Sequence, residues 1–143
     1  MTTGTVAESL GGARVLGTDV DSPLEWVEVL ESGLPIGALD RAIEHRLLSR
    51  EEADQYVIPR RTLSHRRQRG DRLTLEESDR LSRIARITAR ATETFGAADQ
   101  ASLWLREPNG GLGGARPLDL LKSGEGAILV DQILTRIDHG VFT

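Results

Sequence analysis

The residues best suited to chemistry in this sequence are arginines, and most of them lie in one segment. Residues 60–90 hold 10 arginines against 4 acidic residues, whereas the flanking segments 1–59 and 91–143 carry net charges of −7 and −3. The whole chain of 143 residues has a formal net charge of −4. A planar guanidinium can bind phosphate oxygens or a guanine edge through two parallel hydrogen bonds. This basic segment can therefore bind a polyanion although the chain as a whole is acidic.

The densest part of the basic segment has the position of the second helix in a helix-turn-helix. Ser49-Arg-Glu-Glu52 matches a capping box, which predicts the start of a short helix. Ile58-Pro59 ends that helix and starts another, whose inward residue is Leu63. The second helix of such a motif enters the major groove of DNA. The candidate DNA-binding residues are Arg60, Arg61, Thr62, Ser64, His65, Arg66, Arg67 and Arg69.

The arginines also permit a structural interpretation, in which a solvated helix neutralises acidic neighbours. Asp71 is the one acidic residue in 60–72, and this scarcity favours DNA binding. A second stripe follows with a spacing of three or four residues, formed by Arg80, Arg83, Arg86 and Arg90. This stripe could extend the phosphate-binding surface, but pairing with acidic residues of segment 1–59 is the favoured interpretation.

Catalytic chemistry finds little support in the sequence. There is no cysteine, which excludes thiolate nucleophiles, disulfides and thiolate zinc sites. His45, His65 and His139 lie in different predicted helices without metal-ligand spacing. The glycine run at 110–114 lacks the Lys-Ser/Thr of a phosphate-binding loop and follows no strand, so a flexible connector is expected. We expect no enzyme activity, no metal and no cofactor.

Apolar periodicity and helix caps predict an all-α fold. Aromatic residues make up 3% of the chain, so the core must be aliphatic. The longest helix should end before Gly96 and bury a stripe that includes Leu81, Ile84 and Ala91. The predicted helices cover about 23–32, 35–48, 49–56, 60–68, 74–95, 98–105, 117–121 and 124–137.

The same patterns suggest three parts: a flexible leader at 1–21, a helix-turn-helix domain at 22–96 and a small helical domain at 97–143. No apolar run approaches the roughly 20 residues of a membrane span. No secretory signal is visible, and a cytoplasmic location without membrane contact is expected.

A family resemblance rests on motifs in both halves. Residues 101–109 read Ala-x-x-Trp-Leu-x-x-Pro-Asn. They are followed by a glycine-rich loop, by Pro-Leu-Asp-Leu-Leu from 117 and by Arg-Ile-Asp-His-Gly at 136–140. Upstream lie Ala-Leu-Asp from 38, Arg-Thr-Leu-x-x-Arg-Arg from 61 and Glu-Ser-Asp-Arg-Leu-x-Arg from 77. With these motifs in this order, residues 34–143 resemble the Xre/MbcA/ParS antitoxin family.

The resemblance implies an Xre-like helix-turn-helix domain followed by a toxin-binding domain. The expected partner is a cognate RES-domain toxin, an enzyme that depletes NAD, whose active site the C-terminal region blocks. The antitoxin would also bind operator DNA and repress its own operon. Because helix-turn-helix proteins bind paired half-sites, a homodimer within a larger complex with the toxin is expected. The alternative is a stand-alone helix-turn-helix transcriptional regulator without a toxin.

The candidate toxin-binding residues lie on and after the last predicted helix. They are Leu129, Asp138, His139, Gly140, Val141, Phe142 and Thr143. Phe142 would anchor the tail in the toxin's substrate cleft, and the terminal carboxylate could pair with cationic groups there. The alternative is that the tail folds back and closes the core of its own domain.

Overall fold

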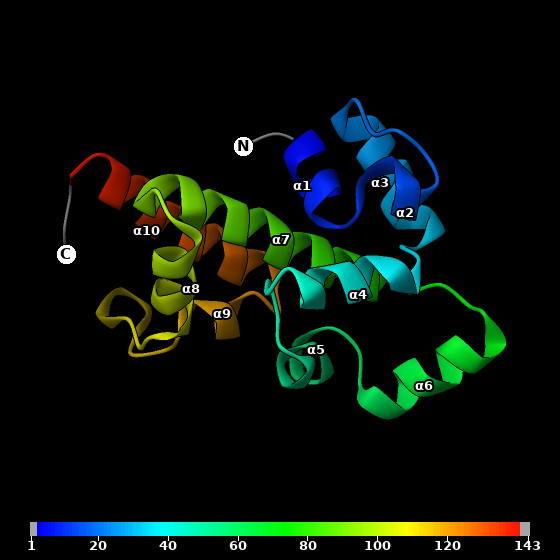
Figure 1. The fold of residues 1–143 in the computed structure, drawn as a ribbon. Helices are drawn as coiled ribbons and strands as arrows, with labels where there is room; N and C mark the ends of the chain where they lie inside the picture. The colour runs from blue at the N-terminus through cyan, green and yellow to red at the C-terminus, as the bar shows by residue number, and fades with distance from the viewer. Residues whose placement is uncertain (1–2, 141–143) are drawn as a thin grey trace. The chain divides into compact units, whose positions relative to one another are not determined.

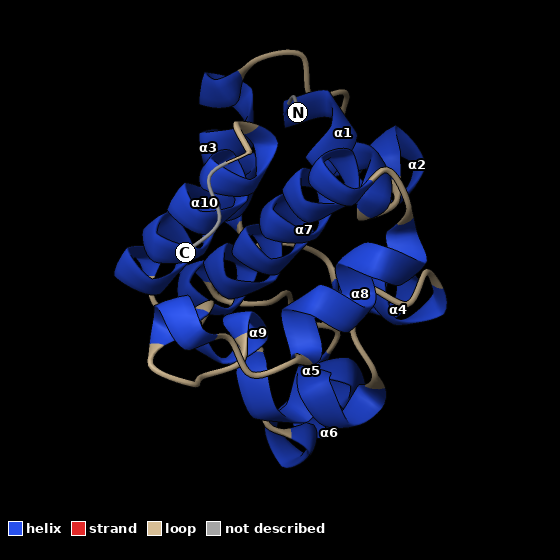
Figure 2. Ribbon diagram, turned by 90° about the vertical axis from the view of Figure 1, so that its left-hand side faces the viewer, coloured by secondary structure: helices blue, strands red, loops and turns tan. Residues whose placement is uncertain are grey.

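The computed structural model describes residues 3–140, and every regular element among them is a helix (Figures 1 and 2). The all-α prediction is therefore confirmed. The chain divides into two compact units between Ala85 and Arg86. The sequence suggested Gly96 as the boundary because glycine ends the long helix, but the division lies inside that helix. Among residues 3–140, none of the helices has the length and hydrophobicity of a transmembrane span.

The first unit contains the elements before Arg86. They are α1 (Thr3–Ser9), α2 (Gly12–Leu16), α3 (Pro23–Ser32), α4 (Ile36–Glu44), α5 (Arg50–Tyr56), α6 (Arg60–Arg69) and the first half of α7 (Leu75–Phe95). Aliphatic residues such as Leu34, Leu39 and Leu81 are fully buried here, as the scarcity of aromatic residues required. The capping box predicted at Ser49 is present, and Thr74 and Glu77 form a second one at the start of α7.

The segment expected to be a flexible leader is largely helical. Val6 and Leu10 are completely buried, and α1 packs against α2 and α3 while α2 packs against α4. The sequence pattern missed these helices because each has only five to seven residues, which is too short to show helical periodicity. Burial of their few apolar side chains, rather than helix propensity, stabilises such short helices.

Two serines on α7 attach the α3–α4 region to the long helix. The indole Nε1 of Trp26 donates to Ser82 Oγ at 2.9 Å, and the backbone N–H of Leu34 donates to Ser78 Oγ at 2.8 Å. Both serines are buried. Because these hydroxyls satisfy donors that would otherwise be buried without a partner, α3 and the start of α4 keep a fixed place on α7.

The second unit contains the rest of α7, followed by α8 (Ala98–Arg106), η1 (Gly110–Leu112), α9 (Pro117–Leu120) and α10 (Gly124–Asp138). α9 packs against both α8 and α10. A Cβ atom at Gly126 would lie 1.8 Å from the carbonyl oxygen of Leu120, so this close approach of α10 to α9 requires glycine. The rings of Phe95 and Trp104 are in contact, with centroids 5.5 Å apart.

The glycine-rich segment expected to be a flexible connector is instead a closed turn. The N–H of Asn109 donates to the carbonyl of Ala115, and the N–H of Gly114 donates back to the carbonyl of Asn109. The side chain of Asn109 also accepts from the N–H of Gly111. The side chain of asparagine commonly forms such a hydrogen bond with the backbone two residues ahead. This local pattern could have predicted the turn from the sequence.

Candidate functional site

The helix with the basic face, α6, has no buried residue, so a few side chains hold it against its unit. Leu63 is half-buried. Arg66 donates to both carboxylate oxygens of Glu77, at 2.5 and 3.2 Å, and also to the carbonyl of Arg72. Arg67 donates to both oxygens of Asp40 on α4. Two bidentate ion pairs, one to α7 and one to α4, therefore fix the rotation of α6 about its axis.

Glu77 caps α7 and binds α6 at the same time. Its carboxylate accepts from the N–H of Thr74 at 2.8 Å as well as from Arg66, and its side chain is 9% exposed. Burial would raise the pKa of Glu77, but the hydrogen bonds from Arg66 and Thr74 and the charge of Arg66 outweigh it and lower the pKa below its usual value. The carboxylate is therefore ionised at neutral pH and keeps α6 attached to α7.

The start of α6 is held by α5. The N–H of Arg60 donates to Asp54 Oδ1 at 2.5 Å, so a side chain from the preceding helix caps α6. The turn between them buries Val57 and Ile58. Arg80 of α7 donates to the carbonyl of Val57 at 2.8 Å, which ties the same turn to the long helix. Together these contacts fix the angle at which α6 leaves α5.

The remaining candidate residues of α6 face solvent. Arg60, Arg61, Thr62, Ser64, His65 and Arg69 are all exposed, as is Gln68. Arg61, His65 and Gln68 share one face because they are four and three residues apart. Among residues 3–140, Arg61 and His65 have no side-chain hydrogen bond or ion pair, whereas Arg69 lies 3.6 Å from Asp71. The sequence argument omitted Gln68 because it followed charge, although helical spacing places Gln68 beside Arg61 and His65.

Three arginines of the second stripe have contacts within the described residues. Arg80 binds the carbonyl of Val57, and Arg83 pairs with Asp79 one turn earlier on α7. Arg90 pairs with Asp131 and Asp138 on α10. For Arg80 and Arg90, the predicted ion pairs with acidic residues of segment 1–59 are not among the contacts of residues 3–140. Arg80 and Arg90 thus support the packing around α7.

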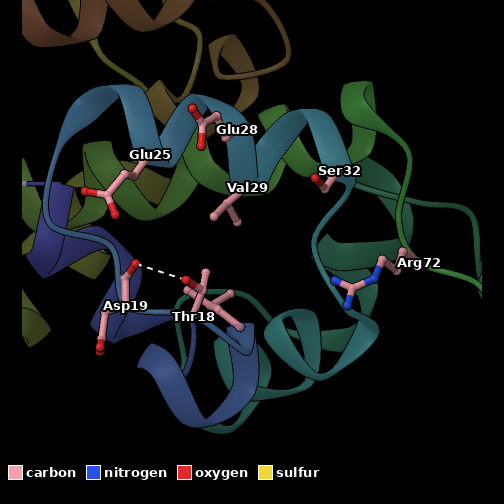
Figure 3. A pocket seen from close by; sticks show the side chains of 8 residues that line it. Thr18, Asp19, Glu25, Glu28, Val29, Ser32 and Arg72 are labelled. Atoms are coloured by element: carbon pink, nitrogen blue, oxygen red, sulfur yellow. Dashed lines mark hydrogen bonds between the residues drawn. The ribbon is translucent and has the colours of Figure 1, made fainter.

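A second surface of the first unit is acidic. A cavity of about 410 Å³ lies beside α3, which supplies Glu25, Glu28 and Val29, while Asp19 lies on the opposite side (Figure 3). Arg72 closes one end, where it donates to the carbonyl of Gly33. Three carboxylates against one guanidinium repel phosphate, so this cavity is unsuited to nucleic acid. Among the described residues, no cluster of histidine and carboxylate ligands could hold a metal ion.

The candidate partner-binding residues belong to the second unit. Leu129 is 50% exposed on α10 beside the equally exposed Ile128. Asp138 ends α10 and accepts from Arg90 at 2.6 Å, while His139 and Gly140 are exposed. Hydrogen bonds from Thr94 and Arg90 lower the pKa of Asp138. Val141, Phe142 and Thr143 lie outside the described residues.

The fold and the exposed basic helix define a helix-turn-helix protein with an additional helical domain. Residues 25–86 match the antitoxin Xre-like helix-turn-helix domain, and residues 90–140 match the antitoxin Xre/MbcA/ParS C-terminal toxin-binding domain. The chain belongs to the Xre/MbcA/ParS antitoxin family.

Three relatives illustrate the similarity. An antitoxin Xre of Photorhabdus laumondii is 30% identical over 130 residues, which cover 90% of this chain and 88% of the relative. An antitoxin Xre of Pseudomonas putida is 40% identical over 102 residues, which cover 71% of this chain but 64% of the relative, less than two thirds of its length. A protein of Sphingobium named Prs ADP-ribosylating antitoxin is 28% identical over 131 residues, covering 85% and 82% of the two chains.

Proposed function

We propose that this chain is the antitoxin of a type II toxin–antitoxin system, which neutralises a cognate toxin and represses its own operon. The observation that carries the proposal is the combination of two features in one chain. The helix-turn-helix unit presents a solvent-facing basic helix, and the unit after it matches a toxin-binding domain. Such a protein would act in the cytoplasm, where its operator DNA and its toxin meet.

In the proposed DNA complex, α6 enters the major groove. Arg61, His65 and Gln68 would face the base edges, since arginine pairs with guanine and glutamine with adenine. Arg60, Thr62, Ser64 and Arg69 would bind phosphates on either side. Arg66 and Arg67 would keep the helix in position through Glu77 and Asp40 and reach the DNA only at the margin of the contact. Two copies would be needed for a site with two half-sites about 34 Å apart.

In the proposed toxin complex, the end of α10 and the residues after it cover the substrate cleft of a RES-domain enzyme that consumes NAD. Leu129, Asp138, His139 and Gly140 would contact the toxin, together with Val141, Phe142 and Thr143. Transfer of ADP-ribose uses NAD as the donor, so the similarity to the Sphingobium protein named Prs ADP-ribosylating antitoxin supports a toxin that acts on NAD.

Co-expression tests the proposal directly. The chain is produced together with the protein encoded by the adjacent reading frame, and growth, cellular NAD and co-purification are measured. We expect that the neighbour alone stops growth and lowers NAD, and that the chain restores both and co-purifies with it. If DNA retention is sensitive to salt but no neighbour is toxic or bound, the chain is a stand-alone regulator and the antitoxin proposal fails.

A further inference from the structure

One side of α3 is exposed, and its residues are both apolar and acidic. Leu24 is 68% exposed and Val27 is 46% exposed, although both side chains are aliphatic. At 100° per residue, a stripe about 100° wide on the helix surface contains Leu24, Val27, Glu28 and Glu31. The buried Trp26 lies on the opposite side of α3, where it bonds to α7. The stripe is thus the solvent-facing side of a helix whose other side is packed.

The acidic cavity of about 410 Å³ adjoins this stripe, because Glu28 belongs to both (Figure 3). Its walls carry the carboxylates of Asp19, Glu25 and Glu28. They also carry the aliphatic side chains of Leu16 and Val29. Among residues 3–140, these three carboxylates form no ion pair. Lysine and arginine have the matching chemistry, since an aliphatic stem carries a charged head. The cavity can therefore receive one such side chain.

The charge of the surrounding sequence indicates the same kind of partner. Residues 15–40 contain six acidic residues and no lysine or arginine. Such a surface attracts a basic protein segment and repels nucleic acid and anionic membranes. A small polycation would be attracted as well, but it would leave Leu24 and Val27 in contact with water. An amphipathic helix with basic residues supplies both contacts, because its apolar face can cover these aliphatic side chains.

We infer that α3 and the adjoining cavity form a docking site for a basic amphipathic helix of another protein. Apolar residues of the partner helix cover Leu24 and Val27, and one of its lysine or arginine side chains enters the cavity, where Asp19 and Glu28 bind its charge. The site then has the apolar centre and polar rim of a protein interface. It uses no residue of α6, so it is separate from the proposed DNA contact.

A designed fluorescent peptide of leucine and lysine tests the site. In one version the leucines fall on one face of a helix. In the other version the same residues are in scrambled order, so the net charge is equal but there is no apolar face. Binding of each peptide to the full chain is measured by fluorescence anisotropy, without DNA or toxin, so the result does not depend on the proposed function. We expect the amphipathic peptide to bind the wild-type chain at least about tenfold more tightly than the scrambled peptide.

Two single variants and two matched controls locate the contact. Leu24→Ser removes an apolar contact and Glu28→Lys reverses a charge of the site, so each should weaken binding of the amphipathic peptide at least about tenfold. Leu103→Ser and Glu107→Lys change an exposed leucine and an exposed glutamate of the second unit and should leave the affinity unchanged. Circular dichroism confirms that all four variants are folded.

Three outcomes would overturn the inference. If the scrambled peptide binds as tightly as the amphipathic one, charge alone explains the binding. If Leu24→Ser and Glu28→Lys lose no more affinity than the two controls, the peptide binds elsewhere. Sedimentation equilibrium covers the third outcome: if the wild-type chain does not bind the peptide but self-associates, and the two α3 variants self-associate less, the occupant is a second copy of this chain.

Discussion

Arg66 on α6 and Glu77 at the start of α7 form a bidentate ion pair that is largely shielded from solvent, with side chains 17% and 9% exposed. The arginines of α6 have two different roles. Arg66 and Arg67 orient the helix through Glu77 and Asp40, whereas Arg60, Arg61 and Arg69 are exposed and can meet a ligand. Stability and ligand binding should therefore respond to different substitutions on the same helix.

Replacing Glu77 with Gln should lower the free energy of unfolding by about 1–3 kcal/mol at pH 7, because Arg66 loses its charged partner. The pKa of Glu77 is lowered in the folded chain, so its stabilising effect is complete above its ordinary value near 4.5 and is lost as pH falls through the folded-state pKa. Urea unfolding of both proteins at pH 7 and at acidic pH measures this. Glu76→Gln, at an exposed neighbouring carboxylate, is the control. If the unfolding free energies of wild type and Glu77→Gln differ by the same amount at pH 7 and at acidic pH, the prediction is wrong.

Replacing Arg61 and Arg69 with alanine should weaken operator binding while leaving the melting temperature unchanged, because both side chains are solvent-facing. The slope of log K against log salt should become shallower by roughly 1 for each lost phosphate contact. Fluorescence anisotropy at several salt concentrations provides the measurement. Arg14→Ala removes an exposed arginine on α2 and should change neither quantity. Unaltered affinity in the folded double variant would remove α6 from the DNA contact.

Gly126→Ala should destabilise the second unit by about 1–3 kcal/mol, because the added Cβ overlaps the carbonyl of Leu120 and α10 must move away from α9. Gly124→Ala is the matched control, since no atom lies within 4 Å of its added Cβ. Thermal unfolding distinguishes the two variants. Equal melting temperatures would show that the α9–α10 contact tolerates a methyl group.

Removing residues 139–143 should leave a folded chain that binds DNA but no longer protects cells from the toxin. Asp138 remains in this truncation, so the ion pair between Arg90 and α10 is retained. The measurements are growth during toxin expression, DNA binding and circular dichroism. A second variant, Asp131→Asn in the full chain, weakens the other ion pair between Arg90 and α10 and should still protect. Full protection by the truncated chain would exclude blocking by the tail.

Local signals in the sequence predicted much of the fold, and long-range contacts account for what they missed. Caps at Ser49 and Thr74 and the glycine after Phe95 place helix ends to within a residue or two, because a cap bonds to backbone only a few residues away. The roles of Arg66 and Arg67 depend on Glu77 and Asp40, 11 and 27 residues distant. Sequence spacing does not predict ion pairs between residues so far apart. The prediction therefore assigned all the arginines of α6 to DNA binding.

The chain has two tryptophans, and each belongs to a different unit. Trp26 is 3% exposed and hydrogen-bonded to Ser82, whereas Trp104 is half-buried against Phe95. Each indole is thus an intrinsic fluorescent reporter of its own unit. With Trp26 replaced by phenylalanine, emission follows the second unit alone, and with Trp104 replaced it follows the first. Whether the two halves melt together or in sequence can therefore be observed without attaching a dye.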